Sequence, residues 1–315
     1  MSVLITGAFG FVGTHLSRWL AQRGHTVWAL DIAETPGHAY ERAFTWDALP
    51  SIPWQHVNAI IHLAGKAHDT KNTSAPEKYF EINVGFTQKI LNTCVVASPP
   101  ALPRTFILFS SVKAAADSVD GILREDHPPA PQTPYGQSKL EAERCIFNAM
   151  EKHPNALRGY VLRPCMIHGP GNKGNLNLLY NVVRRGIPWP LGAFENARSF
   201  ASIQNVCAVV EGLLEKETAP GIYQVADDEP ISTNTLIRLM AESMNRRPRL
   251  LRVSPRLIRA VAKAGDMLHL PLNSERLRKL TESYTASNDK IKNALNWQTM
   301  PVTATDGMRA TLEKM

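Results

Sequence analysis

ITGAFGFVG, residues 5–13, is the stretch that decides the fold expected for this chain of 315 residues. It begins at the end of the apolar segment SVLIT at residues 2–6 and continues into a run that reads as a helix. Its glycines, Gly7, Gly10 and Gly13, are spaced GxxGxxG, one residue longer between the first two than in the simplest dinucleotide fingerprint. Glycines at a strand–helix junction let the backbone approach a pyrophosphate, and the N–H groups of the helix start hold its charge. The loop alone is also compatible with an ordinary glycine-rich turn.

A carboxylate follows the loop at a spacing that favours a dinucleotide. The segment TVWALD at residues 26–31 is the expected second strand, and Asp31 at its end follows Gly13 by 18 residues. This is close to the ~20 residues at which a carboxylate meets the adenosine ribose hydroxyls. A carboxylate there repels the extra phosphate of NADP, and no arginine follows immediately, so we expect NAD.

Short apolar strands alternate with helices through the N-terminal half. Continuously apolar strands separated by helices indicate a parallel sheet covered on both faces. We therefore predict an α/β fold with a Rossmann-type, doubly wound parallel sheet. The expected strands are 2–6, 26–31, 59–65, 104–111 and 159–164, and the expected helices are 11–24, 79–95 and 133–150.

The pattern becomes irregular after residue 165. Helices are expected near 204–216, 233–246 and 254–264. We predict an NAD-binding Rossmann domain at 1–165 and a smaller C-terminal, substrate-binding α/β lobe at 166–315, with some segments of the lobe returning to the first domain.

Composition excludes several other classes of protein. The N-terminus has no basic region of the kind that precedes a secretory signal, and no apolar run approaches the ~20 residues of a membrane span. We therefore expect a cytoplasmic protein without a membrane span. A net charge of +7 favours an anionic ligand or surface. The cysteines stand alone, as expected for small buried hydrophobes in a reducing compartment: Cys94, Cys145, Cys165 and Cys207.

A second motif, TPYGQSKLEAER at residues 133–144, suggests proton transfer. Pro134 suits the first turn of a helix, and Tyr135 and Lys139 lie four residues apart on one helix face. A phenol with its ordinary pKa near ~10 is a poor base at neutral pH. A neighbouring lysine cation, together with an oxidised nicotinamide, lowers that pKa and suits the pair to acid–base work on a hydroxyl or carbonyl. The alternative is a surface helix with an ordinary aromatic near its start.

A hydroxyl that fixes the reacting oxygen is available at a strand end. The buried segment FILFSS ends in Ser110 and Ser111, and strand ends in such sheets meet the ligand crevice. A YxxxK motif alone is often a chance match. The glycine loop, the acidic strand end, the serine and YxxxK in this order are much harder to obtain by accident.

These motifs resemble the extended short-chain dehydrogenase/reductases, in their nucleotide-sugar epimerase/dehydratase branch, over nearly the whole chain. TGAFGFVG resembles that family's cofactor loop, HLAG at 62–65 the strand beside the cofactor, FSSVKAAAD the catalytic-serine segment and PYGQSKLEAE the tyrosine–lysine helix. The resemblance implies that Ser111, Tyr135 and Lys139 are catalytic. It further implies cofactor contacts at Gly7, Phe9, Gly10, Phe11, Val12, Gly13, Asp31, Asp47, Leu63, Ala64, Gly65 and Asn83, besides Tyr135 and Lys139.

The resemblance also implies a substrate site. Asn175 in LRPCMIHGPGNKGNLNLL and Arg198 in RSFASIQNVCAVV correspond to contacts with a nucleotide diphosphate, and Arg276 lies near a second such contact. The chain looks most like bacterial C4 epimerases or 4-keto reductases of UDP-N-acetyl-hexosamines in surface-polysaccharide synthesis. Two departures concern the sugar: alanines at 114–116 replace a common Val-Tyr-Gly, and His168 stands where tyrosine is commoner.

The implied mechanism uses the same residues for epimerisation and for reduction. Tyr135 as phenolate removes a sugar hydroxyl proton while hydride passes to NAD, Ser111 holds the oxygen, and Lys139 lowers the tyrosine pKa and holds the nicotinamide ribose. We expect a homodimer through the helices at 79–95 and 133–150. The alternatives are a dehydrogenase of sterol- or flavonoid-like molecules and a non-catalytic NAD sensor. Asn175 and Arg198 favour the nucleotide sugar.

Two other patterns receive structural interpretations. His62 and His68 lack further convergent ligands, so no metal site is expected. The basic stretch at residues 246–265 mixes apolar and basic residues, which is typical of a membrane-surface helix or of a solvated face over a small core. We favour the solvated face. The stretch has no aromatic residues at stacking intervals, so nucleic-acid binding is not expected.

Overall fold

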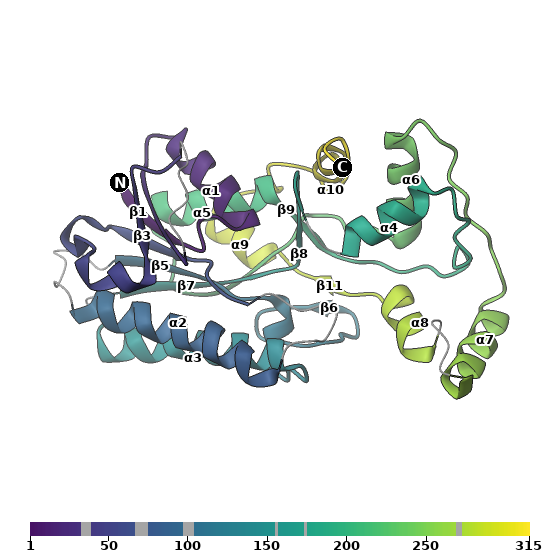
Figure 1. Ribbon diagram of the computed structural model, residues 1–315, viewed down its shortest axis with the longest axis horizontal. Coiled ribbons are helices and arrows are strands. Elements are labelled where there is room, and N and C mark those ends of the chain that lie inside the picture. Colours follow the sequence, from purple (N-terminus) through teal and green to yellow (C-terminus); the bar gives the residue numbers. More distant parts are fainter. Residues whose placement is uncertain (33–38, 67–74, 97–103, 155–156, 173–174, 269–272) are drawn as a thin grey trace.

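The computed structural model describes residues 1–32, 39–66, 75–96, 104–154, 157–172, 175–268 and 273–315. Within these ranges the main element is a seven-stranded sheet with the order β10-β7-β5-β4-β1-β2-β3, in which all neighbours are parallel (Figure 1). Its strands are β1 (Ser2–Thr6), β2 (Thr26–Asp31), β3 (Arg42–Thr45), β4 (Ala59–His62), β5 (Arg104–Phe109), β7 (Leu157–Pro164) and β10 (Gly221–Val225).

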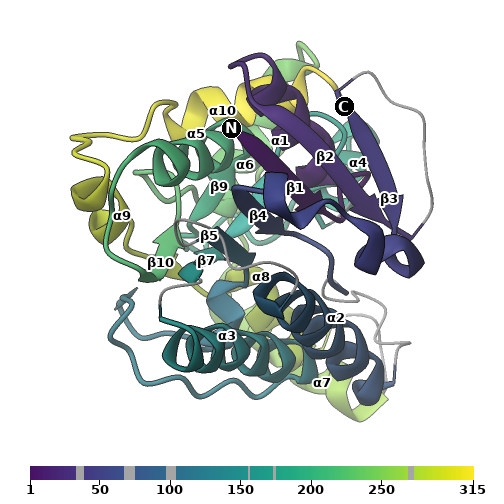
Figure 2. The same ribbon diagram turned by 90° about the vertical axis from the view of Figure 1, so that its left-hand side faces the viewer.

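The central strands are apolar because helices cover both faces of the sheet. Alternate strand residues point to opposite faces, and in β1 Val3 and Ile5 join one hydrophobic cluster while Leu4 joins another. One face carries α1 (Phe11–Ala21), α5 (Ile203–Glu215) and α9 (Asp289–Ala294). The other carries α2 (Pro76–Val96) and α3 (Pro134–Lys152), which lie side by side (Figure 2).

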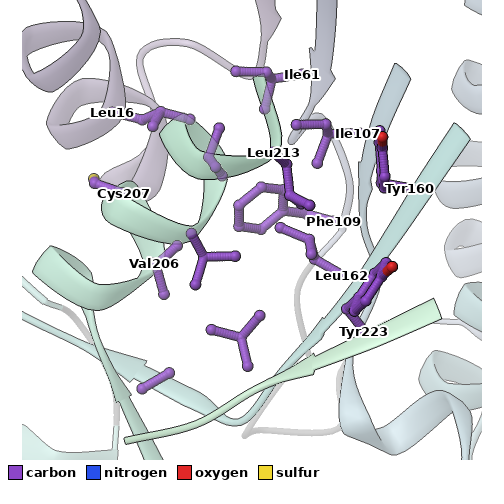
Figure 3. Close-up of a cluster of buried hydrophobic side chains, with 14 of the residues drawn as sticks. Leu16, Ile61, Ile107, Phe109, Tyr160, Leu162, Val206, Cys207, Leu213 and Tyr223 are labelled. Atoms are coloured by element: carbon purple, nitrogen blue, oxygen red, sulfur yellow. The ribbon is translucent and has the colours of Figure 1, made fainter. Parts of the chain in front are cut away.

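The core between the sheet and α5 shows how distant segments meet. Val206 and Leu213 of α5 pack with Ile107 and Phe109 of β5 in one cluster, and Tyr223 of β10 belongs to the same cluster (Figure 3). Burying large aliphatic and aromatic side chains contributes roughly 1.5–3 kcal/mol each. This core therefore fixes β10 and α5 to the sheet formed by the N-terminal half.

The carboxyl ends of the central strands form the edge where a ligand is expected. In the register, Thr6 at the end of β1 lies opposite Leu30 of β2 and His62 of β4. The chain adds β2 and β3 on one side of β1 and the remaining strands on the other. The switch of direction therefore falls between β1 and β4, and open α/β sheets bind their ligands at such a point.

A second group of elements extends away from the sheet (Figure 1). α4 (Asn175–Arg184), α6 (Thr233–Ser243) and α10 (Ala304–Leu312) enclose one small core, and α7 (Pro255–Leu268) and α8 (Ser274–Thr281) enclose another. Two short parallel pairs join this part to the sheet region: β8 (Met166–His168) with β9 (Phe200–Ser202), and β6 (Ile122–Leu123) with β11 (Thr285–Ala286). No helix in the described ranges is both long and apolar enough to cross a lipid bilayer.

The predicted fold class is confirmed by the parallel sheet with helices on both faces. The strands expected to continue to residues 65 and 111 end at His62 and Phe109, after which the chain turns into loops. Two strands of the seven-stranded sheet, and the four strands of the two short pairs, were not expected from the sequence. β3 is an edge strand, and β10 lies after residue 165 yet pairs with β7.

Candidate active site

The glycine loop between β1 and α1 packs against the turn after β4. Gly7 has φ +68°, and a Cβ there would lie 2.8 Å from the Ala64 nitrogen. A Cβ at Gly13 would lie 2.4 Å from the Gly7 carbonyl oxygen. Gly10 caps α1 with an extended backbone and, among the described residues, without a side-chain hydrogen bond. The α1 start is therefore bare backbone, which fits the close approach of a dinucleotide pyrophosphate.

Asp31 ties the end of β2 to this loop. Its Oδ2 accepts a hydrogen bond from the Phe9 N–H at 3.0 Å, and its Oδ1 accepts one from the Ile32 N–H at 2.8 Å. The Tyr40 hydroxyl donates to the Ala8 carbonyl at 2.8 Å and stacks edge-on against Phe9. The carboxylate thus lies beside the glycine loop, where the ribose of a dinucleotide would be held.

The other expected cofactor contacts lie around the same edge. Phe11 and Val12 are in the first turn of α1, and Leu63 and Ala64 follow β4. Asp47 is exposed in a short 3₁₀ helix at Trp46–Ser51, directly after β3. The structure therefore groups the loop, Asp31 and the residues after β4, and places Asp47 beyond the adjacent edge strand.

His62 organises the end of β4 and stays neutral. Its Nδ1 lies 2.7 Å from the Thr6 hydroxyl and its Nε2 lies 3.0 Å from the Thr87 hydroxyl. Thr87 donates its proton to the Asn83 carbonyl, so it can only accept from His62, which assigns the ring proton to Nε2. Burial lowers the pKa of His62 to about 3, with the nearby Lys139 cation as a smaller cause. His62 is thus committed to hydrogen bonds within the fold.

The described part of the chain contains no group of three or more His, Cys, Asp or Glu residues placed to hold a metal ion. His68, the other histidine considered from the sequence, lies outside the described residues.

Asn83 of α2 joins the turn after β4 to α3. Its Oδ1 accepts from the Lys66 N–H at 2.7 Å, and its Nδ2 donates to the Ser138 hydroxyl at 2.9 Å. A Cβ at Gly65 would lie 2.8 Å from the Asn83 Oδ1 and 3.1 Å from the Lys139 Nζ. The bare backbone of Gly65 therefore allows this turn to lie directly against Lys139.

Ser111, Tyr135 and Lys139 come together where β5 ends and α3 begins. Thr133 caps α3, so Tyr135 lies in its first turn, and its hydroxyl hydrogen-bonds Ser111. Lys139 follows one turn later and donates from Nζ to the Phe109 carbonyl at 2.9 Å. The lysine is 7% exposed, so its ammonium is held between the helix and the strand end. This grouping is suited to acid–base chemistry on one oxygen atom.

The two serines at the strand end have different partners. Ser110 donates to the Glu143 Oε1 at 2.5 Å. Glu143 also accepts two hydrogen bonds from the buried Arg163, at 2.9 and 2.6 Å. Ser110 is therefore part of a buried ionic network that holds α3 on the sheet, whereas Ser111 faces Tyr135.

Protein groups alone raise the pKa of Tyr135. Burial around its hydroxyl is the main cause, the Ser111 hydrogen bond opposes it, and Tyr79 adds a smaller upward effect. Burial also lowers the pKa of Lys139 to about 8, with Glu143 opposing. The lowered tyrosine pKa expected from the sequence included the charge of an oxidised nicotinamide. Without that charge, burial outweighs the neighbouring groups, and the phenol keeps its proton near neutral pH.

The expected substrate residues lie on separate elements beyond this site. The Arg198 guanidinium donates to the carbonyls of Lys279 and Glu282 at the end of α8, and Arg276 lies in the first turn of the same helix. Asn175 is the first residue of α4, and its side chain is outside the described part of the structure. The structure thus brings Arg198 and Arg276 to the two ends of one short helix.

Lys113 and Tyr284 are residues at this site that the sequence did not single out. The Lys113 Nζ donates to the Asp117 carbonyl at 2.7 Å and lies 4.2 Å from the centre of the Tyr284 ring. Burial lowers the pKa of Lys113, the carboxylates of Asp117 and Glu282 oppose this effect, and the Arg198 cation lowers the pKa by a smaller amount. Lys113 follows Ser111 by only two residues, and this proximity in sequence could have identified it as a site residue. Its contact with Tyr284 depends on tertiary structure.

Both departures near the expected sugar site are buried in this structure. Ala114, Ala115 and Ala116 pack in the interior, none more than 5% exposed. His168 is fully buried and lies 2.9 Å from the Thr311 hydroxyl of α10. These side chains pack within the fold.

Known proteins share both the sequence pattern and the fold of this chain. Residues 3–226 match the sequence profile of the NAD dependent epimerase/dehydratase family. A UDP-glucose 4-epimerase from Vibrio cholerae is 25% identical over 327 residues, which cover 99% of this chain and 94% of that protein. An N-acetyl-alpha-D-glucosaminyl-diphospho-ditrans,octacis-undecaprenol 4-epimerase from Escherichia coli O157:H7 is 26% identical over 260 residues, covering 78% and 73%. The solved structure of MoeE5 in complex with UDP-glucuronic acid and NAD superposes with a TM-score of 0.76 at 23% identity, covering 99% and 98%.

Proposed function

The chain belongs to the NAD-dependent epimerase/dehydratase family, and from that premise we propose that it is a nucleotide-sugar C4 epimerase or 4-keto reductase. The proposed substrate is a UDP-(N-acetyl)hexosamine used in surface-polysaccharide precursor synthesis. Family membership confirms the predicted NAD-dependent enzyme of the extended type. The choice of sugar, base and reaction within the family is our proposal.

One observation carries the proposal: the Tyr135 hydroxyl hydrogen-bonds Ser111, and Lys139 lies one helical turn away at the same strand end. This arrangement can bind one sugar oxygen and move its proton. A diphosphate-linked sugar is supported by Arg198, whose cation can meet a diphosphate. The Vibrio cholerae and Escherichia coli relatives are named for a UDP-sugar and a diphosphate-linked sugar, respectively.

The cofactor would be held by the glycine loop, Asp31 and the turn after β4. When bound there, NAD supplies the hydride acceptor and donor. The chain's residues handle the proton. Ser111 hydrogen-bonds the reacting sugar oxygen, Tyr135 takes up or releases the proton of that oxygen, and Lys139 holds positive charge at the strand end one helical turn away.

The protonated state of Tyr135 has a consequence for the direction of reaction. Because burial keeps the phenol protonated, it is ready to give a proton to a keto-sugar. To oxidise a sugar alcohol it must first lose that proton, which additional positive charge near the ring favours. The oxidative half-reaction is therefore expected to accelerate as the pH rises above neutrality.

The proposal is tested by incubating the enzyme with a panel of UDP- and dTDP-sugars and separating the products, with and without added NADH. Epimerisation without NADH identifies an epimerase, and conversion of a 4-keto-sugar only with NADH identifies a reductase. Turnover of a sterol- or flavonoid-like alcohol and of no nucleotide sugar would contradict the proposal.

The role of the tyrosine is tested by Tyr135→Phe, with Tyr180→Phe on α4 as the control. The Tyr135 variant should lose turnover by at least about 10²-fold while keeping bound cofactor, because only the proton-transferring atom is removed. Near-normal rates in that variant would show that the site assignment is wrong.

The proposal includes a cytoplasmic homodimer that uses α2 and α3. These helices lie side by side on one face of the molecule (Figure 2), and Phe80 of α2 is 37% exposed. Light scattering during gel filtration measures the mass. Phe80→Glu should convert the dimer to a monomer, and a monomeric parent protein would contradict this part.

A further inference from the structure

α7 has one apolar face that is buried against the molecule. Ile258, Ala262 and Gly265, spaced at i, i+4 and i+7, point inward, and the first two pack with Leu191 and Leu277. These inward side chains form part of the small core under the helix, which is the arrangement expected for a solvent-exposed helix that covers a core.

The same helix carries a second apolar face that points to solvent. Leu257, Val261 and Leu268 are 57%, 45% and 67% exposed, and with the exposed Ala264 they are spaced at i, i+4, i+7 and i+11. Such spacing places them in one stripe along the helix. Met267, which is 82% exposed, lies beside the stripe. A helix that only covered a core would carry polar residues here.

Positive charge is concentrated in the sequence segment that contains this helix. Residues 246–279 contain ten Lys or Arg and two Asp or Glu, a net charge of +8, against +7 for the whole chain. On α7 itself, Arg256, Arg259 and Lys263 are exposed. At ~100° per residue they fall on the third side of the helix, away from both the outward stripe and the buried face. The rest of the sequence is therefore close to neutral, and the net positive charge lies in this segment, with three of its cations on α7.

The position of the helix makes this surface accessible. α7 lies at the end of the molecule farthest from β1–β3, next to α8, and on the opposite side of the substrate lobe from α10 (Figure 1). A flat partner can therefore approach α7 without meeting the sheet.

We propose that α7 lies in the headgroup region of an anionic lipid membrane and attaches the enzyme to the membrane surface. The exposed leucines and valine would enter the boundary of the acyl chains, and the flanking arginines and lysine would meet lipid phosphates. The charge of the surface selects an anionic bilayer over an uncharged partner. The absence of stacked aromatic residues from residues 246–265 disfavours single-stranded nucleic acid.

The test is co-sedimentation of the full-length protein with phosphatidylcholine vesicles, with and without phosphatidylglycerol. The parent protein should pellet with the anionic vesicles only. Leu257→Ser/Leu268→Ser and Arg256→Glu/Lys263→Glu should each weaken binding by about tenfold or more. The matched controls are Ile122→Ser, on a residue 58% exposed in β6, and Lys152→Glu/Lys314→Glu, on exposed lysines elsewhere. Both controls should bind like the parent.

Three outcomes would overturn the proposal. The first is no sedimentation with either vesicle. The second is vesicle binding that Arg256→Glu/Lys263→Glu abolishes and Leu257→Ser/Leu268→Ser leaves unchanged. That result would mean electrostatic attraction to the surface without insertion of the helix. The third is concentration-dependent self-association that the leucine variant abolishes, which assigns the stripe to a second copy of the chain. NAD binding by every variant, measured in parallel, reports whether the fold is intact.

Discussion

Ser110 and Ser111 are neighbours in sequence, yet their hydroxyls serve different functions: Ser110 donates to the buried Glu143, and Ser111 hydrogen-bonds Tyr135. Because the two hydroxyls have different partners, substituting Ser110 should affect mainly the free energy of unfolding, and substituting Ser111 should affect mainly the catalytic rate.

Ser111→Ala is expected to lower kcat by about 10²-fold, because it removes a donor to the reacting oxygen, with little change in stability. Ser110→Ala is expected to lower the free energy of unfolding by about 1–3 kcal/mol, because Glu143 loses a buried partner. Steady-state kinetics and urea unfolding of both variants measure the two effects. The reverse pattern would mean that the serines have been assigned to the wrong functions.

Glu143→Leu is expected to lower the free energy of unfolding by about 3–5 kcal/mol, because it leaves the buried Arg163 guanidinium without its carboxylate. Glu141→Ala on the same helix is the matched control. It removes an exposed pair with Arg144 and should change stability by no more than about 0.5 kcal/mol. Denaturant unfolding measures both, and equal effects would contradict the role of the buried network.

Lys139→Met is expected to abolish activity and yet stabilise the protein by about 1–3 kcal/mol near neutral pH, because it removes a buried charge. Burial lowers the pKa of Lys139 from 10.5 to about 8. Between these values the unfolded chain binds more protons than the folded chain, so parent stability rises with pH across that window. The advantage of the variant should therefore be largest below pH 8 and disappear towards pH 10.5.

Urea unfolding at several pH values measures this difference, with exposed Lys152→Met on the same helix as the control. A variant that is less stable than the parent throughout would show that the hydrogen bond to the Phe109 carbonyl contributes more than the buried charge costs.

Gly13→Ala is expected to abolish NAD binding, because its Cβ would lie 2.4 Å from the Gly7 oxygen and 2.5 Å from the Ala8 oxygen. Gly85→Ala in α2 is the control, since a Cβ there meets no described atom within 4 Å. It should retain NAD binding and gain up to about 1 kcal/mol in stability. Calorimetric titration with NAD measures both variants, and normal affinity of Gly13→Ala would contradict the close packing of the loop.

The sequence predicts those parts of the fold whose signals are local. Short sequence patterns of about ten residues indicate the glycine loop, the apolar strands and the helix that begins at Pro134. These patterns are glycine spacing, capping residues and apolar runs. For this reason the main strands and helices from β1 to α3, apart from β3 and β6, and the grouping of Tyr135 with Lys139 could be expected from the sequence.

Elements held by distant partners could not be predicted in this way. β3 is a short edge strand of which no residue is fully buried, so it has no continuous apolar run. The five residues of β10 form a strand by pairing with β7, which lies more than fifty residues earlier. Likewise, the approach of Lys113 to Tyr284 joins two segments far apart in the chain, and no local pattern encodes such a contact.

Because β10 pairs with β7, the sheet can be completed only late in the synthesis of the chain. Until residue 225 has been synthesised, the long strand β7 is hydrogen-bonded on one side only, to β5. Its other edge is unpaired and can hydrogen-bond a strand of another chain. A nascent chain that ends near residue 165 therefore has an incomplete sheet with an exposed edge and is prone to aggregate. We expect chaperones to engage this enzyme during that interval, and fragments of the first half to aggregate when they are expressed alone.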